Sequence, residues 1–303
     1  MPLKREQDII DSGKSISVSD IDVVSKKPPK STYVGIIPAD GLKSTFEHPF
    51  PPCLLPVGKN INLLEASVMD CMWFRCRQIY IVGYRENLKL YRKTIGDHVR
   101  LPHSMYERKM GTFQPVHHVP IYYVPIHPKD RKKRDSLAWS ALYGVITHKR
   151  VVHFLSEFLN RDGYFFSFPF GMYNPYRVDV FRSKITKFNN FFFNFEGKTV
   201  RDGLYLPFYL NNKEFPRLLK NVRKKMIEDG FFREESIRNE YTLKDVFNLV
   251  PPRKDDVSPF LPFYNEITTW EQYTDYLFKC KQLDFSLVKP RLFKPNRNLQ
   301  KLY

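Results

Sequence analysis

The sequence predicts an α/β protein with a mainly parallel β-sheet and helices on both faces. Short β-branched apolar runs alternate along the chain with segments in which apolar residues recur every three or four positions. The joints between the first of these segments are short, as in a βαβ unit. The chain of 303 residues is 42% hydrophobic, which is enough to bury the core of one large domain or two ordinary ones.

The first βαβ unit is predicted near the start of this alternation. Residues 33–37 and 79–83 are apolar, β-branched runs of the length typical of buried strands. Between them, residues 61–76 place apolar side chains on one face of a helix, which Asn60 or Asn62 would cap. We therefore expect two parallel strands joined by a right-handed helical crossover.

The same patterns predict the remaining elements. Helical periodicity is found at residues 86–94, 136–147, 148–159, 214–229, 242–250 and 269–280. Strand-like apolar runs are found at residues 119–124, 164–170, 190–195, 205–209 and 263–267. The helix at 214–229 is amphipathic, with Leu218 and Val222 on its buried side and Arg223 among the cations on its exposed side.

The two ends of the chain differ from the middle in composition. We expect residues 1–30 to form a polar N-terminal arm, residues 31–285 the α/β domain and residues 286–303 a basic C-terminal tail. No apolar run approaches the ~18–20 residues of a membrane-spanning helix, and the N-terminal residues lack the apolar core of a secretory leader. A cytoplasmic protein, neither secreted by a signal peptide nor transmembrane, is therefore expected.

The chain is strongly basic, with 49 Lys and Arg against 32 Asp and Glu and a formal net charge of +17. Such an excess suits nucleic acid, a phosphorylated ligand, an acidic protein surface or solubility alone. Four cations at residues 131–134 directly precede a predicted helix, where they would bind phosphate or an acidic surface, or remain solvated. Neither the eight histidines nor the four cysteines have the spacing of a zinc site, and the cysteines are expected to be reduced thiols.

The loop after the first predicted strand carries the most informative motif. It reads Ile-Ile-Pro-Ala-Asp-Gly-Leu-Lys-Ser-Thr over residues 36–45 and Pro-Pro-Cys-Leu-Leu-Pro-Val-Gly-Lys over residues 51–59. This loop resembles the opening signature of the sugar-1-phosphate nucleotidyltransferases, or nucleotide-sugar pyrophosphorylases, in which a strand leads to A-x-G-x-G-T-R and then to P-K-x-L-L-P-V-x-x-K-P. The resemblance continues at residues 62–77, 79–86 and 268–273.

The resemblance covers residues 33–97 well and 240–280 loosely. It implies a three-layer nucleotidyltransferase-like fold of the GT-A or Rossmann-like type, with a mainly parallel mixed sheet and helices on both faces. It also implies a nucleotide site in which glycine amides cradle a triphosphate, cations neutralise it and an aspartate in a Gly-Asp pair holds Mg²⁺. Such groups matter because nucleotidyl transfer relies on positioning and on electrostatic stabilisation of oxygen charge.

The expected phosphate and metal groups are replaced in this sequence. Lys43 stands in place of the second glycine, Thr45 in place of the arginine and Pro52 in place of the P-K lysine, while Phe-Gly-Met at residues 170–172 replaces the Gly-Asp pair. Removing one such group typically lowers the rate ~10²–10³-fold. We therefore expect a degenerate member of the family, a pseudoenzyme that is a structural or regulatory subunit of a larger homo- or hetero-oligomeric assembly, in the cytoplasm or in a virion.

Two alternatives stay open. An active sugar-phosphate nucleotidyltransferase or glycosyltransferase would need a rewired phosphate site and Mg²⁺ as its cofactor, and would bind a nucleotide or sugar nucleotide. Its candidate phosphate-binding residues are Gly41, Lys43, Ser44, Lys59, Arg134 and Ser136, and its candidate metal ligands are Asp135 and Asp179. Asp40 is interpreted as a turn residue rather than a metal ligand. A nucleic-acid-associated protein is the third hypothesis, and it rests on charge alone.

Overall fold

The computed structural model of the protein describes residues 33–42, 46, 50–58, 61–100, 118–133, 135–155, 162–173, 178, 190–228, 241–253 and 256–279. These residues belong to one compact unit. The expected limits of the domain, at residues 31 and 285, lie outside the described residues, so the division into arm, domain and tail stays a prediction.

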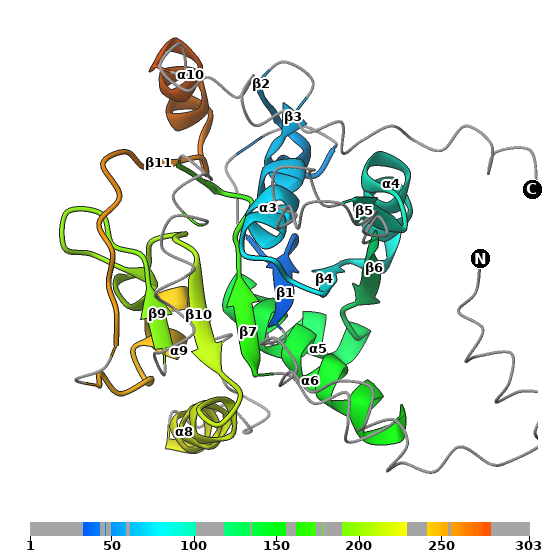
Figure 1. Ribbon diagram of the computed structural model, residues 1–303, viewed down its shortest axis with the longest axis vertical. Helices are drawn as coiled ribbons and strands as arrows, with labels where there is room; N and C mark the ends of the chain where they lie inside the picture. Colours follow the sequence, from blue (N-terminus) through cyan, green and yellow to red (C-terminus); the bar gives the residue numbers. More distant parts are fainter. Residues whose placement is uncertain are drawn as a thin grey trace, which may run out of the picture. The chain divides into compact units, whose positions relative to one another are not determined.

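A seven-stranded sheet forms the centre of the fold, with the strand order β5-β6-β4-β1-β7-β10-β9 (Figure 1). In chain order, its strands are β1 (Tyr33–Pro38), β4 (Gln78–Gly83), β5 (His98–Arg100), β6 (His118–Pro125), β7 (Gly163–Phe166), β9 (Asn190–Phe192) and β10 (Phe208–Asn211). β6, β4, β1 and β7 run parallel, whereas β5 and β10 are antiparallel to their neighbours. The sheet is therefore mixed and mostly parallel, which confirms the predicted fold class.

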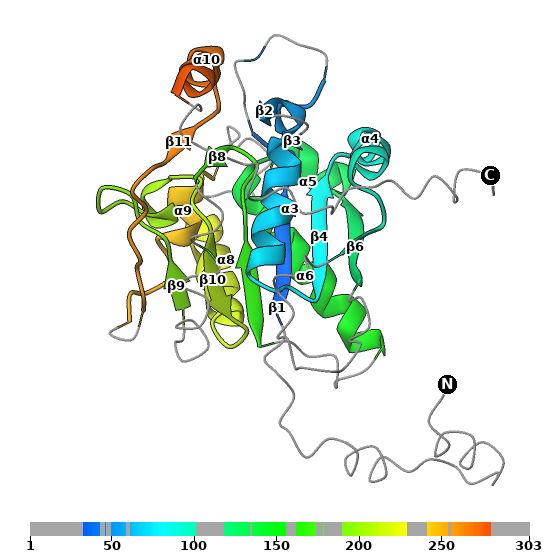
Figure 2. The same ribbon diagram turned by 45° about the horizontal axis from the view of Figure 1, so that its top comes forward.

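The helices are α3 (Leu63–Trp73), α4 (Arg85–Ile95), α5 (Pro128–Lys133), α6 (Leu137–Leu155), α8 (Phe215–Glu228), α9 (Leu243–Phe247) and α10 (Trp270–Lys279). They cover both faces of the sheet (Figure 2). Because successive strand residues point to opposite faces, Gly35 of β1 packs against Cys71 of α3 and Ile36 packs against Gly144 of α6. Rings of β7 on the Ile36 side contact α8 and α9. No helix within the described residues is long and apolar enough to cross a membrane.

Two small two-stranded sheets lie outside the central sheet, and one of them joins distant parts of the chain. They pair β2 (Pro56–Gly58) with β3 (Ile61–Asn62) and β8 (Gly171–Met172) with β11 (Asn265–Glu266), and the 3-10 helices η1 (Pro52–Leu54) and η4 (Val200–Asp202) lie in the connections. The hydroxyl of Tyr273 on α10 donates to the carbonyl oxygen of Pro56 at 2.7 Å, and that of Tyr276 donates to Val57 at 2.9 Å. Two segments that resemble the nucleotidyltransferases, residues 51–59 and 268–273, lie far apart in the sequence and pack together in the fold.

Several elements differ in extent from their predictions. α3, α9 and β11 are shorter than the predicted ranges 61–76, 242–250 and 263–267. The helices expected at 136–147 and 148–159 are the single helix α6, because no Gly or Pro separates them and the buried His148 continues the helical turn. The strand expected at 164–170 ends as β7 at Phe166, ahead of Pro169, and the one expected at 190–195 ends as β9 at Phe192. The strand expected at 205–209 begins only at Phe208, since Pro207 has no N–H to donate to a ladder.

The described cysteines lie in the core and form no disulfide bond. Cys53, Cys71 and Cys76 are buried free thiols, as expected, while Cys280 lies outside the described residues. Burial raises the pKa of the Cys53 and Cys71 thiols well above their ordinary value. Since the thiolate is the nucleophilic form, these side chains serve packing rather than covalent chemistry.

Candidate functional site

The carboxyl ends of the parallel strands β1, β4, β6 and β7 meet at one edge of the sheet (Figure 2). Ligands of open α/β folds bind beyond such ends. We call this region the carboxyl edge, and its described part comprises residues 39–42, 84–87, 126–133, 135–136 and 167–170.

Asp40 ties the loop after β1 to the beginning of α4. Its side chain is buried, with one carboxylate oxygen accepting from the Tyr84 backbone N–H at 2.7 Å and the other from the Asn87 amide at 3.0 Å and the Tyr91 hydroxyl at 2.7 Å. Asn87 and Tyr91 are four residues apart, on the same face of α4. Burial raises the pKa of the Asp40 carboxyl, and these three hydrogen bonds lower it. Both carboxylate oxygens are thus occupied by protein donors.

Gly41 brings the same loop against the start of α6. Its φ of +104° is a left-handed value that suits glycine, and a Cβ at this position would lie 2.8 Å from the carbonyl carbon of Ser136. The Ser136 hydroxyl accepts from the Trp139 N–H at 3.2 Å and so caps the helix. The structure therefore brings the candidate residues Gly41 and Ser136 together, but through a backbone contact that covers the helix terminus.

Tyr84, the residue before α4, contacts two charged residues of the carboxyl edge, Asp135 and Arg131. Its hydroxyl donates to Asp135 at 2.7 Å, and the Arg131 guanidinium carbon lies 3.9 Å from the centre of its ring. Arg131 also pairs with Glu86. Burial, followed by the Asp135 carboxylate, raises the pKa of Tyr84, which keeps its proton on the hydroxyl. The candidate metal ligand Asp135 and the first cation of the 131–134 run are thus engaged with protein groups.

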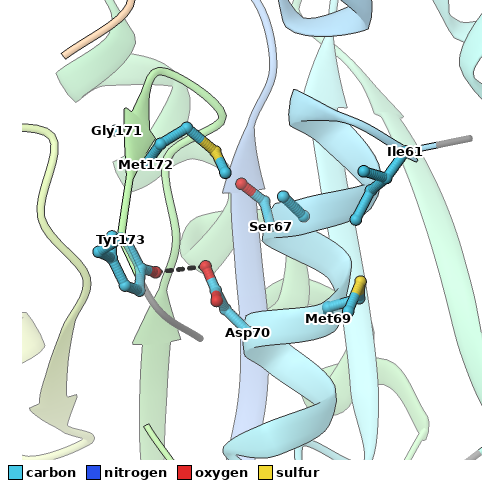
Figure 3. Close-up of a pocket in the computed structure, with 8 residues that line it drawn as sticks. Ile61, Ser67, Met69, Asp70, Gly171, Met172 and Tyr173 are labelled. Atoms are coloured by element: carbon cyan, nitrogen blue, oxygen red, sulfur yellow. Dashed lines mark hydrogen bonds between the residues drawn. The ribbon is translucent and has the colours of Figure 1, made fainter. Parts of the chain in front are cut away.

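The end of β7 carries no carboxylate of its own. Because the strand stops at Phe166, the residues directly beyond it are Ser167 and Phe168, rather than the Phe-Gly-Met at 170–172 expected there from the sequence. The Ser167 hydroxyl donates to Asp70 of α3 at 2.7 Å, and the Tyr173 hydroxyl donates to the same carboxylate oxygen (Figure 3). Burial raises the pKa of Asp70 to about 7, against the opposing effect of these two hydrogen bonds.

The cavity beside Asp70 is too small for a nucleotide. It lies between α3 and β8 with the following Tyr173 (Figure 3), and its volume is about 10 Å³. That is about the space that a single water needs. Asp70 is a residue that sequence reasoning missed, because the predicted helix has one apolar stripe whereas α3 is buried on nearly all sides. The sequence signal that could have identified Asp70 is a carboxylate within an otherwise apolar stretch of a predicted helix.

The described residues of the carboxyl edge carry charges of both signs. The acidic ones are Asp40, Glu86, Asp130 and Asp135, and the cations are Arg85, Lys129, Arg131, Lys132 and Lys133. Within the described residues, no three His, Cys, Asp or Glu side chains form a group that could hold a metal ion. Pro52, in the place of the P-K lysine, begins η1.

Five candidate residues lie outside the described part of the chain. These are Lys43, Ser44, Lys59, Arg134 and Asp179. Thr45, which stands in the arginine position of the signature, lies outside it too. The active-enzyme alternative needs Lys43, Ser44, Lys59 and Arg134 to converge on the carboxyl edge, and this stays a prediction.

Comparison with protein-family models found no matching family, and a search of curated proteins found no match either. Among solved structures, the chain is similar to a provisionally assigned glucose-1-phosphate thymidylyltransferase from Bacillus anthracis in complex with sucrose, with a TM-score of 0.53 and 12% identity over 84% of this chain and 97% of that one. It is also similar to a UDP-glucose pyrophosphorylase complexed with UDP-glucose, with a TM-score of 0.52 and 11% identity over 83% and 99% of the two chains.

The chain has a nucleotidyltransferase-like fold. At 11–12% identity the likeness concerns the arrangement of elements and not the chemistry of the site. The fold implied by the signature in the loop after β1 is thus confirmed.

Proposed function

We propose that this protein is a degenerate, non-catalytic relative of the sugar-1-phosphate nucleotidyltransferases that has a structural or regulatory role as a subunit of a larger assembly. The observation that carries the proposal is the buried Asp40 carboxylate in the loop after β1, which three protein donors hold in place. In this proposal, residues 31–285 are the nucleotidyltransferase-like domain, and the arm and the basic tail flank it.

Electrostatics support the loss of catalysis. Nucleotidyl transfer needs preorganised positive charge where oxygen charge develops. At the described part of the carboxyl edge, the Asp40 and Asp135 carboxylates already accept hydrogen bonds from protein donors, and Arg131 already pairs with Glu86, so these groups are engaged within the protein. The Gly41 contact with Ser136 further occupies the start of α6, where an anion would gain from the helix dipole.

Surface composition supports the assembly role. Large apolar side chains are exposed on three helices, with Phe154 84%, Phe278 83% and Ile227 67% accessible. Together with a net charge of +17, such side chains suit contacts with protein neighbours. In this proposal, the assembly is either a cytoplasmic complex or a virion.

A turnover assay tests the proposal. The purified chain is incubated with Mg²⁺, each of the common nucleoside triphosphates and a panel of sugar 1-phosphates, and pyrophosphate release is followed. We expect no release above the protein-free background. Turnover that is lost in Lys43→Ala or Lys59→Ala, and kept in a matched variant of an exposed α4 lysine, Lys89→Ala, would overturn the proposal and establish the active, rewired enzyme instead.

A further inference from the structure

Helices α6 and α8 pack on the face of the sheet opposite α3 and leave an open groove, lined by residues of both helices. The groove has a volume of about 750 Å³, and an adjoining cavity of about 270 Å³ extends it towards the end of α8. The two share Trp139, Ile146, Leu219 and Arg223 as lining residues, so they form one continuous depression.

The floor of this groove is apolar and comes from both helices. It is made by Trp139, Ile146, Phe215, Leu219, Val222 and Met226. Two further apolar side chains stand at the far ends of the depression, Phe154 on α6 and Ile227 on α8, with 84% and 67% of their surface accessible. Exposed apolar side chains that continue a recessed apolar surface are typical of an interaction site.

The sides of the groove are basic. Lys149, Arg150 and Arg223 line it, with Asp130 as the acidic residue at one end. Among the ion pairs of the described residues, none includes Lys149, Arg150 or Arg223. The Lys149 ammonium lies 5.2 Å from the centre of the Phe215 ring, at the junction of floor and side. These cations are therefore available to acidic groups of a bound partner.

We propose that the groove docks an acidic amphipathic helix of a protein partner. An apolar floor between basic sides is complementary to a helix with one apolar stripe flanked by Asp and Glu. Along α6, the lining residues from Trp139 to Phe154 span about 22 Å at ~1.5 Å per residue, which matches a bound helix of about four turns. This inference rests on the proposed assembly role and specifies the kind of partner.

The floor argues against nucleic acid as the occupant. Phosphate and sugar are bound by polar and cationic groups, and bases stack on exposed aromatic faces. Here the aliphatic side chains of Ile146 and Leu219 lie among the aromatic ones, and they offer no ring on which a base could stack. Such a surface gains free energy by burying apolar side chains and gains little from a phosphate backbone.

A displayed library of helical peptides, about 15 residues long and random at their exposed positions, tests the inference on the full chain. We expect selection to enrich peptides with apolar residues at i, i+3, i+4 and i+7 flanked by Asp or Glu. Their dissociation constants should rise at least about tenfold in the double variant Arg150→Glu/Arg223→Glu. The matched variant Lys220→Glu alters an exposed cation of α8 that does not line the groove, and it should leave binding unchanged.

Ile227→Ala provides a second test without a change of charge, because this exposed side chain lies at the groove's end; it should weaken the selected peptides several-fold. The inference is overturned if selection yields no binders, or yields basic or uncharged peptides, or if the charge-reversed double variant binds as wild type. Binding of a single-stranded RNA oligonucleotide that the same double variant abolishes would also overturn it. Pyrophosphate release, measured separately, reports on the proposed lack of catalysis, so the two failures are distinguishable.

Discussion

Helix α6 joins two regions of opposite chemistry. At its start, Gly41 covers the Ser136 backbone and the carboxylates of Asp40 and Asp135 accept hydrogen bonds from tyrosines. Along its second half, Lys149 and Arg150 face an open groove with an apolar floor. In the described residues, the Asp40 and Asp135 carboxylates at the customary ligand edge are thus bound to the protein's own donors, whereas Lys149 and Arg150 line the groove without an ion-pair partner among these residues.

Of the substitutions that test this contrast, Asp40→Ala should have the largest effect on stability. The substitution removes the acceptor of three hydrogen bonds at a buried position, and each unsatisfied buried donor costs about 1–3 kcal/mol. We expect a loss of about 4 kcal/mol in the free energy of unfolding, measured in urea. Asp97→Ala, which breaks an exposed pair with Arg92, is the control and should cost less than about 1 kcal/mol. Equal losses in the two variants would contradict the structural role of Asp40.

Gly41→Ala tests the closed contact between the loop and α6. A left-handed φ and a Cβ placed 2.8 Å from the Ser136 backbone should together cost about 2–3 kcal/mol of stability. Gly197 also has a left-handed φ, of +76°, but nothing lies within 4 Å of its added Cβ. Gly197→Ala should therefore cost only about 1 kcal/mol. If thermal unfolding shows the same shift for both variants, the loop is not pressed against α6.

Asp70→Asn tests the buried carboxyl beside the end of β7 through its pH dependence. Its pKa is about 7 in the folded state and lower in the unfolded chain, so the folded protein binds more protons between about pH 4 and 7. Stability of the wild type should then fall as the pH rises through this window, by about 2 kcal/mol from pH 5 to 8 relative to Asp70→Asn. Urea unfolding at several pH values checks this, and parallel curves for the two proteins would refute the raised pKa.

Tyr84→Phe should have the smallest effect. The variant loses the hydrogen bond to Asp135 but keeps the ring that Arg131 covers, so we expect a loss of about 1 kcal/mol in stability. Chemical denaturation measures this change. A loss of several kcal/mol would mean that the Tyr84–Asp135 hydrogen bond contributes as much to stability as the buried bonds of Asp40. That result would contradict the smaller role that we assign to Tyr84.

Local periodicity was enough to predict the centre of the fold. The predicted ranges 33–37, 61–76 and 79–83 contain most or all of β1, α3 and β4, and the two strands are parallel as predicted, because buried strands and a helical crossover leave clear apolar patterns. Asn62, one of the two predicted caps, caps α3 through a capping box with Glu65. Element ends such as those of β7 and β10 were less predictable, since tertiary pairing and proline positions set them.

The side chains of the site were predictable only in part. Composition marks Asp40 as a turn residue, but its bonds reach Asn87 and Tyr91, which are far away in sequence and approach only when β4 and α4 are in place. The groove follows likewise from the separation of α6 and α8, which no local pattern contains. The sequence does show the basic outer side of α8, including Arg223, so half of the groove's chemistry was visible beforehand.

Calorimetric titration of the protein with Mg²⁺ and nucleoside triphosphates tests the central claim most directly. If the carboxyl edge is closed by the protein's own contacts, as we propose, the titration should show no saturable heat up to millimolar nucleotide, in the wild type and in Lys43→Ala/Lys59→Ala alike. Saturable, Mg²⁺-dependent binding at micromolar nucleotide that the double variant abolishes would contradict the account, because it would place a working triphosphate site where we infer that none remains.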